Sequence, residues 1–184
     1  TFNGNSSVNA GCAYIDGREL PANTTNNLSI TNCTFNSNST IDGFGGCLYF
    51  YQMGYVMDGC TFEGNIANGG SAGAIYNGGP NKTFSISNSD FISNNGAFGG
   101  AMASYSAGTI GSVDNCYFSQ NSANTSGGAI ITGFTANVAY TNCEFEANSA
   151  NFGGASFNQN DSTVVTFENS LFLANNSENS GGAI

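Results

Sequence analysis

The side chains that could perform acid–base chemistry in this 184-residue chain are carboxylates, because it has twelve Asp and Glu, two cations and no His. Cleavage of a polysaccharide needs two carboxylates that converge on one bond. Glu144 and Glu146 flank Phe145 and should face solvent. Three other acids recur at one position of a repeat, which should place them about 10 Å apart; they are Asp58, Asp114 and Glu168. We therefore expect a protein that is not an enzyme, with a polysaccharide-degrading enzyme as a remote alternative.

Metal ions, cofactors and nucleic acids are not expected as ligands. Calcium takes about six to eight oxygen ligands, which scattered carboxylates do not supply. A nucleic-acid surface needs clustered Lys and Arg, whereas Arg18 and Lys82 are single cations in different loops. No apolar run approaches the ~20 residues of a membrane-spanning helix, so we expect no membrane span in this segment.

The elements that must position these side chains belong to a repeat. A Phe followed three residues later by Asn recurs along the chain, and a Gly followed by a small residue recurs in phase with it. Four of the six intervals between successive Phe residues are 27 residues long, which indicates a solenoid or a related repeat. The Phe residues, expected to stack inside, are Phe2, Phe35, Phe62, Phe91, Phe118, Phe145 and Phe172. The Asn residues, expected to hydrogen-bond along the axis, are Asn5, Asn38, Asn65, Asn94, Asn121, Asn148 and Asn175.

Each copy of the repeat predicts three short β-strands. The residues seven and five before each Phe are mostly apolar, and the one between them is mostly small or polar, as in a strand with one buried face. A Cys-x-Phe strand and a Gly-Gly-Ala-Ile strand, as at Gly127 to Ile130, follow after turns rich in Asn and Gly. The prediction is an all-β parallel β-helix over residues 1–184, with about seven coils of ~27 residues and an insertion loop at about residues 16–25.

The six cysteines occupy two positions of the repeat. Equivalent positions in adjacent coils should lie ~4.8 Å apart, within the Cα separation that a disulfide tolerates. The repeat register therefore selects three disulfides, which are Cys12–Cys47, Cys33–Cys60 and Cys116–Cys143. The alternative is that all six are buried free thiols in stacked small-residue positions. Disulfides would place the chain in an oxidising, extracellular compartment.

Asn-x-Ser/Thr sequences, the acceptors of N-linked glycans, are numerous in this chain. Several coincide with the recurring Asn positions, where Asn has a structural role. The better glycosylation candidates fall in predicted loops, and they are Asn23, Asn81, Asn124 and Asn160.

Gly-Gly-Ala-Ile alternates with Phe-x-x-Asn along the whole chain, at Gly127 to Ile130 and Gly181 to Ile184 and with variants at Gly45, Gly99 and Gly153. The pair resembles the repeat of the polymorphic outer membrane protein family, autotransporter-like surface adhesins of chlamydiae. Similar repeats occur in surface proteins of other bacteria, algae and other protists. The resemblance implies a right-handed parallel β-helix on a cell surface, and right-handed connections are the rule for parallel strands. It says less about activity, because a fold does not fix a function.

Two non-enzymatic functions fit these observations. Charged residues make up only 8% of the chain, which favours close packing of the coil walls. Neither end shows a capping segment that would stop strand edges from pairing. We expect a segment of a longer protein that serves as a structural component of an extracellular filament or cell-surface layer and contacts copies of itself or neighbouring subunits. The alternative is a cell-surface adhesin, with glycans or surface receptors as partners.

Overall fold

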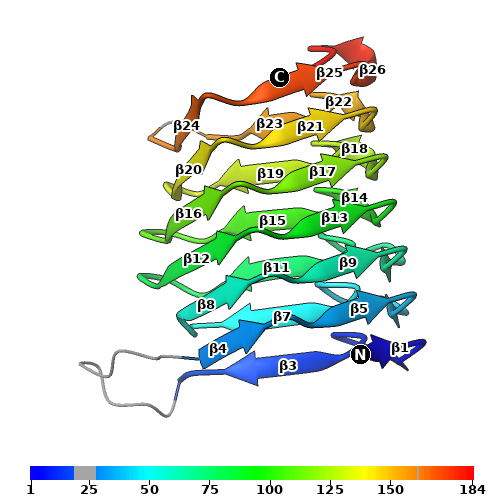
Figure 1. Cartoon of the computed structure of the whole chain (residues 1–184), viewed down its shortest axis with the longest axis vertical. Helices are drawn as coiled ribbons and strands as arrows, with labels where there is room; N and C mark the ends of the chain where they lie inside the picture. The colour runs from blue at the N-terminus through cyan, green and yellow to red at the C-terminus, as the bar shows by residue number, and fades with distance from the viewer. Residues whose placement is uncertain (19–27, 161) are drawn as a thin grey trace.

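The chain winds as a parallel β-helix in a computed structural model that describes residues 1–18, 28–160 and 162–184 (Figure 1). The described residues form twenty-six strands and no helix. Strands at the same place in successive coils pair in parallel, and most paired residues, such as Val113 and Tyr140, are 27 positions apart. The predicted all-β solenoid and its period are therefore confirmed.

Four parallel sheets run along the axis, and we name them A to D. Sheet A has seven strands: β1 (Phe2–Asn3), β5 (Thr34–Asn36), β9 (Thr61–Glu63), β13 (Asp90–Ile92), β17 (Tyr117–Ser119), β21 (Glu144–Glu146) and β25 (Leu171–Leu173). Sheet B has seven: β2 (Ser6–Ser7), β6 (Ser39–Thr40), β10 (Ile66–Ala67), β14 (Asn95–Phe98), β18 (Ser122–Ser126), β22 (Ser149–Phe152) and β26 (Asn176–Ser180).

Sheets C and D complete each coil. Sheet C has six strands: β3 (Ala13–Asp16), β7 (Leu48–Tyr51), β11 (Ile75–Gly78), β15 (Met102–Tyr105), β19 (Ile130–Gly133) and β23 (Ser156–Asn158). Sheet D has six: β4 (Leu28–Thr31), β8 (Tyr55–Asp58), β12 (Thr83–Ser87), β16 (Ile110–Asp114), β20 (Asn137–Thr141) and β24 (Val164–Glu168). The described strands thus make six four-stranded coils followed by β25 and β26, close to the seven expected.

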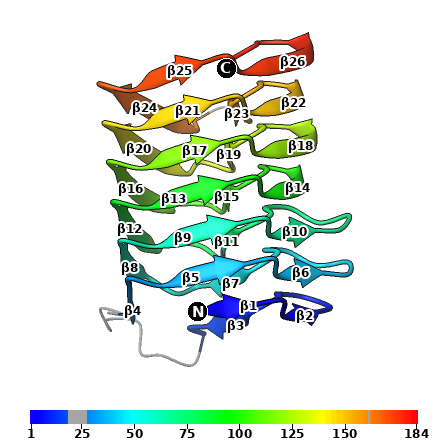
Figure 2. The same cartoon turned by 45° about the vertical axis from the view of Figure 1, so that its right-hand side comes forward.

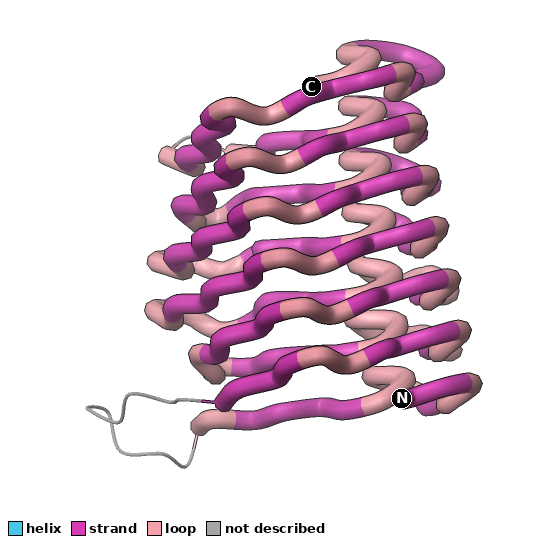
Figure 3. The backbone as a smooth tube through the Cα atoms, in the orientation of Figure 1, coloured by secondary structure: helices cyan, strands magenta, loops and turns pink. Residues whose placement is uncertain are grey.

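The coil is right-handed, as the resemblance implied. The near strands β5, β9 and β13 run to the right in Figure 1 and the far strands β7 and β11 run to the left, while the chain climbs from the N-terminus to the C-terminus. The tube in Figure 3 follows the same path around each coil. Of the expected insertion loop at residues 16–25, only Asp16 to Arg18 belong to the described residues.

The prediction of three strands per coil is wrong, because sheet B adds a fourth. Its strands line one edge of the solenoid in Figure 2. In the first coils they are two residues long and polar, as in Ser6–Ser7, so no alternation marks them. The Gly-Gly-Ala segment is also not a strand but the bend before sheet C. The first Gly has a left-handed backbone, as at Gly127 (φ 68°), and a Cβ on the second, as at Gly100, would lie 2.0 Å from the Gly128 carbonyl oxygen.

The predicted turn between sheets D and A is confirmed. Its Asn residues adopt the left-handed backbone that Asn tolerates, for example Asn88 (φ 48°) and Asn142 (φ 53°). This turn directs the following strand of sheet A so that its Phe points inward. The alternation in sheet D is confirmed as well: in β12, Phe84 and Ile86 are buried while Thr83 is exposed.

The interior is built around the Phe stack. The recurring Phe rings lie nearly parallel, with neighbouring centroids 4.6 to 5.0 Å apart. The five central rings are at most 2% exposed, which confirms that they are internal. Phe2 is 46% exposed and Phe172 is half-buried, since each has a stacking partner on one side only. Replacing a buried Phe by Ala typically costs about 3 to 5 kcal/mol.

The recurring Asn residues form a hydrogen-bonded ladder where sheets A and B meet. Asn121 Oδ1 accepts hydrogen bonds from the backbone N and from Nδ2 of Asn94, both at 3.0 Å. Asn121 Nδ2 donates to the Phe91 carbonyl oxygen at 2.9 Å and to Asn148 Oδ1 at 3.0 Å. The pattern continues from Asn5 to Asn175, and Asn38 to Asn148 are completely buried. The expected ladder is confirmed, and it satisfies backbone groups that the bend would leave unpaired.

Candidate functional site

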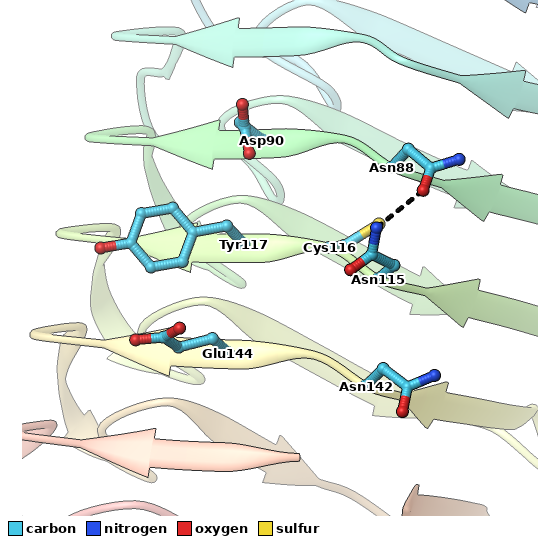
Figure 4. A pocket seen from close by; sticks show the side chains of 7 residues that line it. All are labelled: Asn88, Asp90, Asn115, Cys116, Tyr117, Asn142 and Glu144. Atoms are coloured by element: carbon cyan, nitrogen blue, oxygen red, sulfur yellow. Dashed lines mark hydrogen bonds between the residues drawn. The ribbon is translucent and has the colours of Figure 1, made fainter. Parts of the chain in front are cut away.

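A polar groove of about 360 Å³ lies beside the turns between sheets D and A (Figure 4). It is lined by Asn88, Asp90, Asn115, Cys116, Tyr117, Asn142 and Glu144. The Asn side chains stand one above another because each occupies the same left-handed turn position. Asn115 Nδ2 donates to Asn88 Oδ1 at 2.7 Å, so neighbouring turns are tied together.

The candidate acids at this edge act as acceptors for the turns. Asp58 accepts hydrogen bonds from Asn88 Nδ2 at 2.6 Å and Ser87 Oγ at 2.7 Å, and these bonds lower the pKa of Asp58. Asp114 accepts one from Asn142 Nδ2 at 3.0 Å. A general acid on a carboxyl needs a raised pKa, and the shift at Asp58 has the opposite sign.

Glu144 and Glu146 lie in β21 on either side of the buried Phe145, so the prediction that both face outward is confirmed. The Tyr117 hydroxyl donates to Glu146, and this hydrogen bond raises the pKa of Tyr117. Glu144 pairs with Tyr117 across the sheet register. The two glutamates therefore have separate surroundings: one is bound to a phenol and the other borders the groove.

Within the described ranges, no three His, Cys, Asp or Glu side chains gather closely enough to bind a metal ion. The same ranges contain no helix with the length and hydrophobicity that crossing a membrane requires.

The structure brings the three predicted cysteine pairs together but contains no disulfide, because all six cysteines are free thiols. Cys47 Sγ lies 3.0 Å from Cys12 Sγ and donates a hydrogen bond to it. This bond lowers the pKa of Cys12, while burial raises the pKa of Cys47. The other two pairs are in register across sheet A, where the backbone N of the residue after one Cys donates to the carbonyl of the other at 2.9 to 3.0 Å.

Four of these thiols have a structural role that the sequence analysis missed. Cys116 Sγ donates to the carbonyl of Asp114, two residues earlier, at 3.3 Å. In the coils that carry Ser instead, Ser89 Oγ makes the same bond to Ser87 at 2.7 Å. A hydrogen bond to Cys143 and burial together raise the pKa of Cys116. The alternation of Cys and Ser at one repeat position was the signal for this shared bond.

The glycosylation candidates differ in accessibility and setting. Asn81, Asn124 and Asn160 are exposed, while Asn23 lies outside the described residues. Asn81 and Asn160 sit in turns with left-handed backbone. Asn124 lies within β18 rather than in the loop that was predicted. Asn38, another acceptor sequence, is completely buried in the ladder.

The outer face of sheet C carries a cluster of aromatic side chains that sequence analysis did not find. We call it the aromatic face. It comprises five Tyr of sheet C, with Phe98 from the end of β14 and two Phe from connecting segments: Tyr14, Tyr49, Tyr51, Tyr76, Tyr105, Phe98, Phe44 and Phe134. The Tyr49 ring centroid lies 4.8 Å from that of Tyr14 and 5.1 Å from that of Tyr76. Phe44, from the connection between sheets B and C, reaches to 4.7 Å from Tyr76. The signal was the recurrence of Tyr at outward positions of β3, β7, β11 and β15.

Comparison of the chain with protein-family models, with curated proteins and with solved structures found no match in any of the three. The resemblance to the polymorphic outer membrane protein repeat therefore remains a hypothesis that rests on the two sequence motifs.

Proposed function

We propose that this chain is a non-enzymatic structural component of an extracellular filament or cell-surface layer. The observation that supports this most is axial continuity: the Asn ladder and the Phe stack run without a break from Asn5 to Asn175 and from Phe2 to Phe172. A solenoid of this kind is stabilised by contacts between neighbouring coils. Each coil therefore adds length and stability together, which suits a rod.

The extracellular location is part of the proposal and depends on the cysteines. In an oxidising compartment, each adjacent pair can close into a disulfide by exchange with a disulfide-bonded carrier. The two thiols give up two protons and two electrons, and the carrier disulfide is reduced to two thiols. By the chain-entropy argument each bond would add about 3.5 to 4 kcal/mol. Mass spectrometry of peptides from unreduced native protein tests this, and persistent free thiols at all six positions would contradict it.

Electron microscopy of native, unreduced material tests the structural role. The proposal predicts continuous fibres or ordered layers with an axial spacing near ~4.8 Å, the distance between parallel strands. Single rods tethered to cells, with no ordered assembly, would contradict it. The Asn121→Ala variant tests whether the assemblies depend on the Asn ladder. It interrupts the ladder at one coil and should therefore shorten or abolish the assemblies.

A cell-surface adhesin is the second candidate, and the aromatic face favours it. The side chains of Tyr14 and Phe44 are 46% and 44% exposed. Large aromatic side chains usually stabilise a protein or an interface by being buried. Exposed clusters of this kind commonly mark binding surfaces. We also propose that glycans, if attached, occupy the exposed Asn81, Asn124 or Asn160, none of which belongs to the aromatic face.

A further inference from the structure

We propose that the aromatic face binds a neutral polysaccharide, with successive sugar rings packed against Phe44, Tyr76 and Tyr105. This binding activity goes beyond the structural role and does not depend on it.

A groove in the aromatic face has the size and lining of a small-ligand site. It measures about 360 Å³ and is lined by Phe44, Ser71, Tyr76, Phe98, Tyr105 and Gln159. Ligand sites are typically about 300 to 1,000 Å³, with aromatic walls and a few polar groups. A protein partner would instead need about 800 Å² of contact on each side. The groove therefore suits the rings of an oligosaccharide better than a flat protein surface.

Glycines in sheet C make room for the rings of the aromatic face. A Cβ at Gly133 would lie 2.7 Å from Tyr105 Cε2, so the Tyr105 ring occupies the space that a side chain would fill. A Cβ at Gly78 would lie 2.8 Å from Tyr49 Cε2 and 2.9 Å from Tyr76 Cε1. The rings of Tyr105, Tyr49 and Tyr76 thus lie in space that a side chain at Gly133 or Gly78 would fill.

Polar groups at this surface are available to sugar hydroxyls. Burial, with a smaller contribution from Tyr105, raises the pKa of Tyr76 to about 12, and burial alone raises the pKa of Tyr105. Neither phenol hydroxyl forms a hydrogen bond with another of the described residues. Both phenols are therefore protonated at neutral pH, and among the described residues neither is committed to a carboxylate in the way that Tyr117 is. Gln159 adds an amide with both donor and acceptor atoms.

The charge at the face selects a neutral ligand. The chain has a net charge of −10, yet none of the described residues that line the groove is charged. At the N-terminal end of the face, Asp16 is paired with Arg18 at 2.5 Å, and Arg18 also lies over the Tyr51 ring at 5.2 Å. An anionic polymer would meet a protein of like charge whose cation at this face, Arg18, is already paired with Asp16. A neutral polymer would meet rings, hydroxyls and an amide among the described lining residues.

The direction of the polymer follows from the register. Tyr14, Tyr49 and Tyr76 are aligned in adjacent strands, and their rings succeed one another at 4.8 and 5.1 Å. Neighbouring rings are nearly perpendicular, at 83° and 87°, so they present a face and an edge in turn along the axis. The polymer would accordingly lie along the solenoid axis and cross successive coils of sheet C.

Titration with neutral hexasaccharides tests the proposal. Cellohexaose, mannohexaose and maltohexaose would be added to the chain, with a galacturonate hexamer as the charged comparison. The chain has eight Tyr and no Trp, so tyrosine fluorescence reports on the face, and calorimetry gives the affinity. We expect at least one neutral hexasaccharide to bind and the galacturonate hexamer not to bind. Tyr76→Ala and Phe44→Ala should each weaken binding about fivefold to tenfold.

Tyr117→Ala is the matched control, because Tyr117 is a partly exposed tyrosine on sheet A, away from the face. It should leave the affinity unchanged, and circular dichroism should show every variant to be folded. The proposal is overturned if no neutral hexasaccharide binds the folded chain, or if Tyr117→Ala weakens binding as much as Tyr76→Ala does. It is also overturned if sedimentation shows a dimer that Tyr76→Ala dissociates, because a second copy would then occupy the face. None of these results bears on fibre formation, which microscopy tests separately.

Discussion

The Asn ladder and the aromatic face lie in the same coils, yet they use sequence in opposite ways. The ladder repeats one residue type in every coil from Asn5 to Asn175. The corresponding outward register position in sheet C changes in successive coils through Tyr14, Tyr49, Tyr76, Ala103, Ile131 and Phe157. The ladder position must satisfy buried backbone groups in every coil. The sheet C position makes no contact that recurs in every coil, although Ala103 and Ile131 are buried there in a small cluster with neighbouring aromatic side chains. We therefore look for function at positions whose residue type changes from coil to coil.

Breaking the ladder should have the largest effect. Asn121→Ala removes the acceptor of the Asn94 backbone N and the donor to the Phe91 carbonyl, both buried. We expect the free energy of unfolding to fall by about 3 to 5 kcal/mol, because several buried polar groups lose their partners at once. Urea denaturation measures this loss. Asn124→Ala, at an exposed Asn three residues away, is the control and should change stability little.

The bend before sheet C should be the next most sensitive place. In Gly100→Ala the new Cβ would meet the Gly128 carbonyl oxygen at 2.0 Å, and backbone cannot move aside as a side chain can. A loss of about 2 to 3 kcal/mol is expected from overpacking. Gly64→Ala is the matched comparison, because Ala147 and Ala174 hold the equivalent position with φ of 52°. Equal losses in the two variants would show that the close approach of coils is not the cause.

The aromatic face should contribute less to folding. Tyr76→Ala removes a half-buried ring that contacts Phe44 and Tyr49 outside the Phe stack. We expect a loss of about 1 to 2 kcal/mol in the same denaturation experiment, because the variant loses the partial burial of the ring together with aromatic pairs that contribute about 0.5 to 1.5 kcal/mol beyond burial. A loss as large as that of Asn121→Ala would erase the contrast between the two regions and make the face a structural one.

Alkaline pH should reduce the contribution of the aromatic face to stability through ionisation of Tyr76. Burial raises the pKa of Tyr76 to about 12, above the value of about 10 in an unfolded chain. The folded state then keeps a proton that the unfolded state loses, so this stabilisation is complete below pH 10 and disappears as pH rises through 12. Its size should be about 1 kcal/mol or less, since the ring is partly solvated. Tyr76→Phe should lose less stability than the wild type between pH 10 and pH 12 in parallel unfolding curves; identical pH profiles would contradict this assignment.

The smallest effect is expected at the Cys position beside the Phe stack. Cys116→Ser in reducing buffer should change stability by about 0.5 kcal/mol or less, because Ser89 makes the equivalent bond to the carbonyl two residues earlier. Thermal unfolding before and after reduction checks this. A loss confined to the unreduced protein would mean that the Cys116–Cys143 disulfide forms there.

Much of the fold could be predicted because the same sequence pattern occurs in several successive copies of the repeat. The Phe stack, the Asn ladder and the alternation in sheet D each recur at fixed spacing, and each follows from a short-range rule about burial or backbone conformation. Sheet B could not be predicted in the same way. Strands such as Ser39–Thr40 are too short and polar to alternate, and they exist because the coils on either side supply their hydrogen bonds.

The candidate sites also contain some features that the sequence predicts and others that only the structure shows. The adjacency of Cys12 with Cys47 followed from the register alone, and the Asn turns followed from the recurring Asn. The hydrogen bonds from these turns to Asp58 and Asp114 became apparent only in three dimensions. The aromatic face was hidden for another reason. Phe44 and Tyr76 are 32 positions apart and belong to different copies, and the lengths of the intervening connections decide whether they meet.

The sequence by itself determined the solenoid, its period and the residues that fill it, because those properties depend on which residue types recur and at what spacing. Tertiary structure alone decided which side chains from different coils gather on one outer surface. Outward positions are constrained by no recurring contact, so their neighbours are set by register, by connections of unequal length and by glycines such as Gly78 and Gly133 that leave room for a ring.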